Sequence, residues 1–558
     1  MEKGFLRRSV VLIMVTLMVL LIACNKDTGG MPGTSGTPES TEPTPESSAP
    51  AASADSNVSR EGLPIVKDTI TLEGMVSKDV KVPDWNEHPA TAELEKRTNI
   101  QIEWDCVPSE GFAEKRNLRF ASNDLPDFLI RAGLTPDLEM KYASAKQIIA
   151  LDEYFDYAPN LTRLMSEDKS IYQNIVLPDG HVYSLPQLNE TEANLINKYW
   201  LNMKWLKNLN LEVPETTEDF YNVLKAFVEK DPNGNGKADE IGYSGSFKEN
   251  PLEIIRNFLG SWGFGKNAGI INGLMDVDDS GKIRLITIEP KYKEVIEFMN
   301  RMWKDGLIDK EIFSQQSAQV ISKITADQVG FTNFGNNTLW MGVNSDNYDQ
   351  PPVLKGPYGD SIWSNVNPKV QTTGTFVITG KNQYPEETMR WADYFYSKEG
   401  TILVRLGIEG KSFSIDKDGK YQLLDEIKND PTGLGQDQAQ AKWTLYCGGG
   451  IPQYAIDELD QSPAQLPAMK KTTETLRPDL IPLSSIPRLK FTEEESIRLG
   501  TYSQDIKTYI TQNIVKFITG EQSMSKWDKY VSDLQKMDIE DYISIYQESY
   551  DRWKNTLN

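Results

Sequence analysis

Histidine, cysteine and basic residues are all scarce in this chain of 558 residues. The two histidines, His88 and His181, disfavour a histidine-rich zinc site and a relay of several histidines. Three cysteines, Cys24, Cys106 and Cys447, are too few for a disulfide scaffold, and we expect Cys106 and Cys447 to be free thiols. Lys and Arg number 59 against 81 Asp and Glu, a formal net charge of −22. This excess of acid argues against nucleic acid as a partner, because binding to phosphates requires a basic surface.

Long apolar runs are also missing, except for one near the N-terminus. Ser9 to Ala23 is almost wholly apolar and follows Lys3, Arg7 and Arg8. A run of about fifteen residues is short for a bilayer span and suits the core of a signal peptide. Since no other segment is long and apolar enough to span a bilayer, we predict that the rest of the chain is extracytoplasmic.

The apolar run ends in Leu21-Ile22-Ala23-Cys24, which is similar to the lipobox of bacterial lipoproteins. We therefore predict a lipoprotein signal peptide over residues 1–23, with a lipid on the thiol of Cys24. The alternatives are an ordinary signal peptide and an uncleaved anchor. Residues 24–63 are rich in Ser, Thr, Pro, Gly and Ala and predict a flexible linker that cannot bury a core of its own. The lipid alone is expected to anchor the folded part to the cell membrane.

The folded part begins with alternating strands and helices. Their apolar spacing predicts strands around 70–72, 100–106 and 127–130, and helices over 92–97 and 110–122. This order predicts an α/β fold with a parallel sheet, which binds ligands at the carboxyl ends of its strands. The loop 77–88 and the residues after Ile130 are therefore candidates for a ligand site.

Helices dominate the later sequence. Thr216 and Asp219 predict a capping box at the start of one of them. A short strand is predicted over 376–378, and the last sixty residues or so, from about Ser496, are expected to be mostly helical.

Several short motifs in a fixed order carry a resemblance to a known family. They are LEKRTNI at 94–100, ASNDLPD at 121–127, PETTEDF at 214–220, DYFYSKEG at 393–400 and GIEG at 407–410. With the lipobox and the linker, they resemble the family-1 extracellular solute-binding lipoproteins of ABC importers. This is the type common in Paenibacillus, and alginate- and fructo-oligosaccharide-binding proteins are among its relatives.

The resemblance implies an α/β, two-lobed, periplasmic-binding-protein-like fold of type II, in which two lobes joined by a hinge close on a ligand. Lobe 1 is expected to comprise 64–195 and 371–425, and lobe 2 to comprise 196–370 and 426–558. The implied protein is a monomer and no enzyme. It captures a solute, with an oligosaccharide favoured, and delivers it to the permease subunits of an ABC transporter.

The segment 231–240 predicts a structural calcium site. Its candidate ligands are Asp231, Asn233, Asn235, Lys237 through its carbonyl, Asp239 and Glu240. Oxygens at alternate positions with Gly236 at the sixth match the start of an EF-hand loop, and oxygen ligands favour calcium over zinc. The twelfth position is Gly242 instead of Glu, so Asp239 and Glu240 must complete the site, a departure also found in the oligosaccharide-binding relatives. The alternative is a polar Asn-Gly turn after a helix.

A sugar site needs aromatic rings for the apolar sugar faces and polar side chains for the hydroxyls. Loop positions make the following residues candidates for ligand binding: Trp85 with Asn86, Arg131, Trp262, Trp340, Trp363, Glu409, Trp443 and Tyr446. Each could instead serve packing or, for Arg131, an ion pair. Four other tryptophans, Trp104, Trp205, Trp303 and Trp391, lie in apolar patterns and are expected in the core.

Two other functions remain open. A secreted glycosidase would also suit an acidic chain with many Trp residues, because two carboxylates can hydrolyse a glycosidic bond. Release of sugar during a long incubation would identify such an enzyme. The other alternative is a surface lipoprotein that binds peptides or other solutes, or acts with a sensor, without import.

Overall fold

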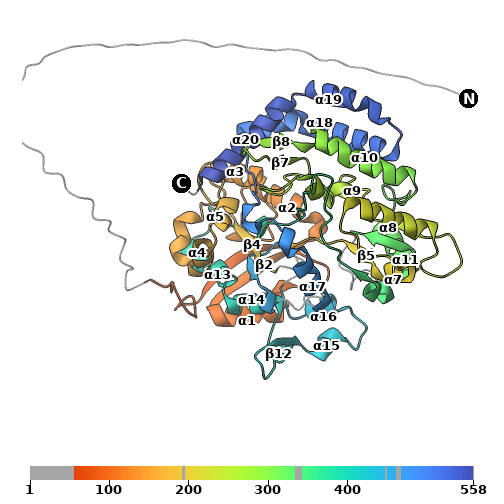
Figure 1. Cartoon of the computed structure of the whole chain (residues 1–558). Coiled ribbons are helices and arrows are strands. Elements are labelled where there is room, and N and C mark those ends of the chain that lie inside the picture. The colour runs from red at the N-terminus through yellow and green to blue at the C-terminus, as the bar shows by residue number, and fades with distance from the viewer. Residues whose placement is uncertain (1–55, 192–194, 334–341, 446–448, 460–466, 557–558) are drawn as a thin grey trace, which may run out of the picture. The chain divides into compact units, whose positions relative to one another are not determined.

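The computed structural model describes residues 56–191, 195–333, 342–445, 449–459 and 467–556 (Figure 1). The predicted signal peptide, Cys24 and most of the predicted linker lie outside these ranges, as do Trp340, Tyr446 and Cys447. Within the described part, no helix combines the length and the apolar character that a bilayer crossing requires.

The first lobe is built on a sheet of six strands. Their spatial order is β14 (Gln453–Ala455), β4 (Leu185–Asn189), β11 (Val370–Ile378), β3 (Phe128–Ile130), β1 (Ile70–Lys78) and β2 (Ile100–Pro108). β1 is parallel to β2 and β3, whereas β11 runs antiparallel to both of its neighbours. The helices α1 (Pro89–Thr98) and α2 (Ser109–Ser122) connect β1 to β2 and β2 to β3. The predicted α/β arrangement of the first 70 folded residues or so is confirmed.

Aromatic residues fill the core against this sheet. Gly74 on β1 leaves room for them, since a Cβ there would lie 2.7 Å from the Phe128 ring and 2.9 Å from the Trp104 ring. Trp104 and Trp391 are buried in this core, as predicted from their apolar patterns. The remaining elements of the first lobe are α3 (Pro136–Ser144), α4 (Pro159–Glu167), α5 (Ser170–Ile175), α13 (Pro385–Tyr394), α14 (Lys398–Arg405), β12 (Phe413–Ile415), β13 (Tyr421–Leu423), α15 (Asp425–Lys428) and α16 (Gln436–Gln440).

The second lobe holds a smaller sheet and most of the remaining helices. Its strand order is β10 (Tyr348–Asp349), β5 (Trp200–Asn202), β9 (Val329–Thr332) and β6 (Ile241–Tyr243). Its helices are α7 (Met203–Leu209), α8 (Thr217–Glu229), α9 (Glu253–Arg256), α10 (Pro290–Lys304), α11 (Ser317–Thr325) and α17 (Pro467–Leu476), with a hairpin of β7 (Met275–Val277) and β8 (Ile283–Leu285). The predicted capping box of Thr216 and Asp219 is confirmed at the start of α8.

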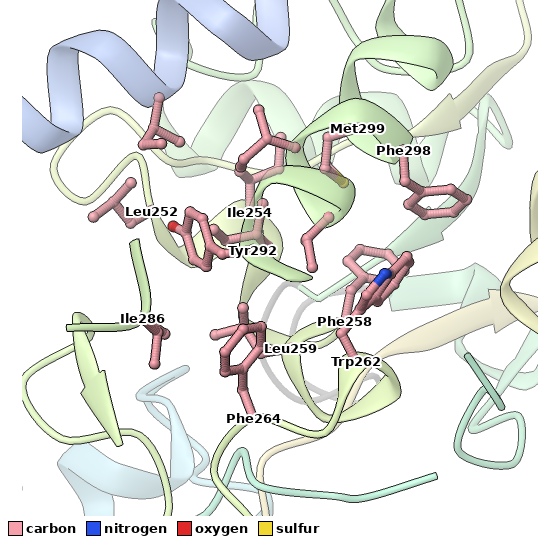
Figure 2. Packing of buried hydrophobic residues seen from close by; sticks show 14 of the residues in the cluster. Leu252, Ile254, Phe258, Leu259, Trp262, Phe264, Ile286, Tyr292, Phe298 and Met299 are labelled. Carbon is pink, nitrogen blue, oxygen red and sulfur yellow. The ribbon is translucent and has the colours of Figure 1, made fainter. Parts of the chain in front are cut away.

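The core of the second lobe is rich in aromatic rings (Figure 2). The ring of Phe298 on α10 packs 5.6 Å from that of Trp262 and 5.9 Å from that of Phe258. The C-terminal helices α18 (Glu493–Thr519), α19 (Trp527–Gln535) and α20 (Ile539–Asn555), drawn in blue in Figure 1, bury one face each in this core. The prediction of a helical C-terminus is confirmed.

Three segments run side by side between the two sheets and form the hinge. The first, 190–199, leads from β4 to β5, and the second, 350–369, leads from β10 to β11. They pair antiparallel through Ile196 and Val366. The third, 479–490, begins with a parallel bridge between Leu480 and Trp363.

Two predicted lobe boundaries need correction. β14 pairs in parallel with β4, and Ile427, Ala441 and Leu445 are buried in cores of the first lobe. Most of residues 426–459 therefore belong to the first lobe, and not to lobe 2 as the resemblance implied. The predicted linker also ends too late, because Val58 is buried and bridges to Val66. Pairing in a sheet was not visible in these short segments.

Candidate ligand-binding site

Side-chain amides gather near the carboxyl end of the first sheet, beside the hinge. Gln187 on β4 donates from Nε2 to Oε1 of Gln371 on β11 over 2.7 Å. Its own Oε1 accepts the main-chain N–H of Gly450 over 2.7 Å. Asn189 donates from Nδ2 to the same Gln371 oxygen over 3.4 Å. We call Gln187, Asn189, Gln371 and Gln453 the amide cluster.

Gln453 is the most deeply buried member of the amide cluster. It lies opposite Gln187 in the parallel pair of β14 and β4 and is fully buried. Neither its Oε1 nor its Nε2 has a hydrogen-bond partner. An unmade hydrogen bond of a buried amide costs about 1–3 kcal/mol, so this place in the sheet calls for a polar partner, which an ordered water or a ligand can supply.

Arg131 lies next to the amide cluster, as the rule for parallel sheets predicted. It follows β3 directly and has a left-handed backbone, with φ of 54°. A Cβ on Gly450 would lie 3.9 Å from Cγ and Nε of Arg131, so the arginine stem passes over that loop. A left-handed conformation is unfavourable for a residue with a Cβ, and such strain is concentrated at functional sites. A role of Arg131 in ligand binding stays a prediction.

A charged network holds the hinge next to the amide cluster. Lys369 donates to Oδ2 of Asp168 over 2.7 Å and to Oε1 of Glu190 over 3.1 Å. Tyr454 donates to the other oxygen of Glu190 over 2.7 Å. Burial opposes the charge on Lys369, but the hydrogen bonds to both carboxylates outweigh it and raise the lysine pKa. The network therefore remains charged and fixes the ends of β4, β11 and β14 together.

The second sheet also presents polar residues at the carboxyl ends of its parallel strands. Ser244, directly after β6, donates to Oδ2 of Asp309 over 2.6 Å. Gln315 donates to the carbonyl of Gly245 over 2.7 Å. Asn333 follows β9, and its Oδ1 would lie 3.2 Å from a Cβ on Gly245. Buried hydrogen bonds thus fix this loop, and each lobe offers a rigid polar edge beside the hinge.

Three predicted ring platforms belong to the cores instead. Trp85 is 1% exposed, and its ring meets that of Trp104 edge to face at 4.7 Å. Trp262 is 3% exposed in the core of the second lobe. Trp363 is fully buried at the hinge, where its Nε1 donates to the carbonyl of Asn197 over 3.1 Å. These predictions were wrong, because short loops in the sequence turned out to be tightly packed helical turns and crossing segments.

Other predicted residues lie elsewhere. The side-chain amide of Asn86 is hydrogen-bonded to the edge strand β2, because it donates to the carbonyl of Trp104 and accepts the Trp104 N–H. Glu409 is exposed and bridges to Phe413 in the small core under the hairpin β12–β13. Trp443 is half-buried against the same core. Within the described ranges no hydrogen bond joins Asn86, Glu409 or Trp443 to the amide cluster. Asn86 is therefore withdrawn as a ligand residue, and the other two stay predictions.

The amide cluster itself was missed by sequence reasoning. Gln187 lies within the short strand β4, and Gln453 is the first residue of β14. Only part of β11 was predicted as a strand. The available signal was a buried polar residue in each of several strands. Without their pairing, nothing in the sequence brings these residues together.

The segment 231–240 folds as a loop organised by Asp231. Its Oδ1 accepts the N–H groups of Gly234 and Asn235, and its Oδ2 accepts that of Gly236. Asn235 also donates to Oδ1 of Asp239 over 3.0 Å. The side chains predicted as ligands are thus brought together around one loop.

The carboxylate of Glu240 lies near two other carboxylates of this loop and lacks a partner. Its Oε1 is buried without a hydrogen-bond partner. Burial, and then the charges of Asp231 and Asp239, raise its pKa. A cation would remove both the missing contact and the repulsion, so the donor set fits calcium. No cluster of three or more His, Cys, Asp or Glu with metal-site geometry occurs within the described ranges, so the two asparagines and a carbonyl would have to contribute.

Cys106 is a half-buried free thiol on β2. Burial raises its pKa to about 11, which keeps the thiol protonated and unreactive at neutral pH.

Comparison with known proteins identifies the family. The sequence pattern described as bacterial extracellular solute-binding protein matches residues 84–402. The chain is 31% identical over 526 residues to the fructooligosaccharide ABC transporter substrate-binding protein FusA of Streptococcus pneumoniae. The alignment covers 91% of this chain and 95% of FusA. The chain belongs to the bacterial extracellular solute-binding proteins.

Solved structures of this family agree with the fold. FusA from S. pneumoniae in complex with kestose matches 87% of the chain and 99% of FusA, with a TM-score of 0.68 at 30% identity. A second FusA structure is of an EF-hand mutant in complex with fructo-nystose. An extracellular solute-binding protein from Bifidobacterium longum subsp. infantis matches with a TM-score of 0.74 at 20% identity, over 87% of this chain and 98% of that one. The two-lobed type II fold predicted from the resemblance is confirmed.

Proposed function

We propose that this solute-binding protein captures an oligosaccharide between its two lobes and delivers it to the permease of an ABC transporter. The observation that carries the proposal is the amide cluster, in which the two buried polar atoms of Gln453 lack partners next to the hinge. Carboxamides both donate and accept, as a sugar hydroxyl does. The match to FusA supports an oligosaccharide over a peptide.

The ligand contacts proposed here are more polar than the sequence led us to expect. Gln371 holds the Gln187 amide through its Oε1, so its Nε2 remains as a donor for a hydroxyl. Arg131 adds a positive charge that suits hydroxyl oxygens and carboxylates alike. The remaining candidates for stacking of a sugar on an aromatic ring are Trp443, which is half-buried, and Trp340 and Tyr446, which lie outside the described residues.

The opposite polar edge supplies the second half of the site. Gly245 and Asn333 stand where β6 and β9 end, and the hydrogen bonds of Ser244 and Gln315 fix this loop before any ligand arrives. A fixed polar edge on each lobe lowers the conformational entropy that binding must remove. We therefore propose that closure brings two preformed surfaces onto one ligand molecule, which is released unchanged and not hydrolysed.

A structural calcium ion in the loop 231–240 is part of the proposal. The buried Oε1 of Glu240 supports it, as does the EF-hand named for FusA. Asp231, Asn233, Asn235, the Lys237 carbonyl, Asp239 and Glu240 would hold the ion. The loop also reaches the second sheet, because Gln328 beside β9 donates to Asp239 over 2.9 Å. The ion would therefore stabilise the start of β9, the strand that Asn333 follows.

We also propose that the protein works as a monomer anchored outside the membrane by a lipid on Cys24. The lipobox over residues 21–24 supports this anchor. A tethered receptor has a high local concentration near its permease.

Binding of oligosaccharides tests the proposal. The full-length protein is titrated by calorimetry with kestose, nystose, alginate oligosaccharides and a peptide mixture in the presence of calcium. We expect saturable binding of one glycan class with the ligand intact after a long incubation. At a hundredfold excess over the dissociation constant, such a ligand adds about 2.7 kcal/mol to the free energy of unfolding. Binding of peptides alone would contradict the proposal, as would release of shorter sugars.

A further inference from the structure

The second lobe contains a cavity that the proposed sugar site does not use. It measures about 200 Å³ and lies between α9, the loop 270–274 and Lys507 of α18. None of the residues that line it belongs to the first lobe or to the crossing segments. Leu252 and Leu259 in its wall are part of the core drawn in Figure 2, so one side of the cavity is apolar.

Arg256 lines the cavity and has a donor without a hydrogen-bond partner. Its Nη1 donates to Oε1 of Glu253 over 2.9 Å. Its Nε is buried and has no hydrogen-bond partner. The side of a guanidinium that carries Nε matches the two oxygens of a carboxylate, and charge-assisted bonds of this kind are the stronger ones. A buried N–H of a charged group without an acceptor favours an anion as the missing partner.

Lys507 adds a second positive charge at the cavity. It is exposed on α18, and within the described part of the chain it takes part in no ion pair or hydrogen bond. Arg256 and Lys507 against the single carboxylate of Glu253 leave the walls with one net positive charge. This local excess contrasts with the net charge of −22 for the chain.

The far wall of the cavity is held in place by polar contacts. Asn272 has a left-handed backbone, with φ of 55°, and donates from Nδ2 to the hydroxyl of Tyr546 over 2.6 Å and to that of Tyr542 over 3.2 Å. These bonds fix the loop 270–274 against α20. The cavity is therefore bounded by fixed elements instead of a loose surface loop.

We propose that this cavity binds a small monocarboxylate. Its carboxylate would accept from Nε of Arg256 and lie near Lys507, and its short carbon chain would lie against Leu252 and Leu259. The cavity of about 200 Å³ suits an organic acid of a few carbons better than an oligosaccharide. The single net charge favours a monoanion over a dianion.

Titration with matched ligands tests the site. The full-length protein is titrated with butyrate, lactate and pyruvate, and with butyramide, which has nearly the shape of butyrate and no charge. We expect saturable binding of the carboxylates and at least tenfold weaker binding of the amide. Absence of saturable carboxylate binding, or equal binding of butyramide, would overturn the proposal. Because the proposal does not depend on the sugar site, the result should be the same with and without kestose.

Two variants with a matched control locate the site. Lys507→Gln should weaken carboxylate binding about tenfold, and Arg256→Gln should abolish it. Lys516→Gln makes the same change of charge on the same helix, away from the cavity, and should leave binding unchanged. Equal loss in Lys516→Gln and Lys507→Gln would overturn the proposal, since it would reveal a general effect of charge. If Arg256→Gln does not fold, the exposed Lys507 still carries the test.

Discussion

Arg488 donates a hydrogen bond from Nε to the main-chain carbonyl of Val370 over 2.5 Å. Its Nη2 reaches the carbonyl of Gln371, whose side chain belongs to the amide cluster. The N–H of Arg488 donates to Oδ1 of Asn174, which also accepts Nε1 of Trp553 on α20. The C-terminal helices are thus tied to the hinge directly beside the proposed ligand site.

Arg488→Lys should weaken oligosaccharide binding about fivefold to tenfold. Lysine keeps the charge but cannot reach two carbonyls with the geometry of a guanidinium, so Gln371 is held less firmly. Titration calorimetry measures the change. Arg301→Lys is the control, because the guanidinium of Arg301 also makes two hydrogen bonds, but to Glu218 on α8 and not to a hinge segment. Equal losses in both variants would contradict a specific role for Arg488.

Gln371→Ala should lower oligosaccharide affinity by roughly tenfold, the equivalent of one or two lost hydrogen bonds. The midpoint of thermal unfolding should also fall, because the buried amide of Gln187 loses the acceptor of its Nε2. Gln101→Ala, an exposed position on β2 of the same sheet, should leave affinity unchanged. If Gln371→Ala bound oligosaccharides with unchanged affinity, the proposal that the amide cluster contacts the ligand would be contradicted.

Trp85→Ala should lower the free energy of unfolding by about 3–5 kcal/mol, because it empties a fully packed site beside Trp104. Denaturant unfolding measures the loss, and Trp85→Phe should lose less. Oligosaccharide affinity of the folded fraction should be unchanged in both variants. A variant that kept its stability and lost affinity would restore Trp85 as a ligand platform.

Removal of calcium should lower the unfolding midpoint, and Asp231→Asn should abolish the response to added calcium. Asp231 provides both a ligand and the acceptor of three main-chain N–H groups in the loop. Asp278→Asn is the matched control, since Asp278 also accepts main-chain N–H groups, from Ser280 and Lys282, in the turn between β7 and β8. Calorimetric unfolding with and without a chelator gives the comparison, and an identical midpoint for the unchanged protein would refute the calcium site.

Glu139 should make stability fall as pH rises from about 4.5 to 7. Burial raises its pKa to about 7, while Lys490 and Ser184 act in the opposite direction. In this range the unfolded chain loses the proton that the folded chain keeps, so the free energy of unfolding decreases.

Glu139→Gln removes this dependence, so its stability relative to the unchanged protein should rise between pH 4 and pH 8. Denaturant unfolding at both pH values measures it. Glu110→Gln, an exposed change on α2, should show no such trend. A constant difference for Glu139→Gln would mean that the carboxyl group titrates normally.

Local patterns in the sequence predicted local structure well. The start of α8 follows from the reciprocal bonds of Thr216 and Asp219, which involve residues three apart. The strands around Ile100 and Phe128 follow from alternation and apolar runs. Arg131 was placed correctly at the end of β3, because the ends of parallel strands share one edge.

The amide cluster could not be predicted in the same way. Gln187 and Gln371 meet because β4 and β11 pair across 184 residues of sequence, and Gln453 joins them from a third segment. The prediction that loop tryptophans bind the ligand was wrong for a related reason. A ring such as that of Trp363 looks accessible between polar neighbours until Tyr199, from another crossing segment, packs 5.0 Å from it.

The strand order of the first sheet also fixes the sequence of events when the chain emerges N-terminus first. β11 inserts between β3 and β4, yet every strand of the second sheet precedes it in the chain. The edges of β3 and β4 that pair with β11 therefore have no partner strand until the second sheet has emerged completely. Open edges invite pairing with other chains. Nascent chains of this protein are thus most vulnerable to aggregation after β4 has been synthesised and before β11 has been.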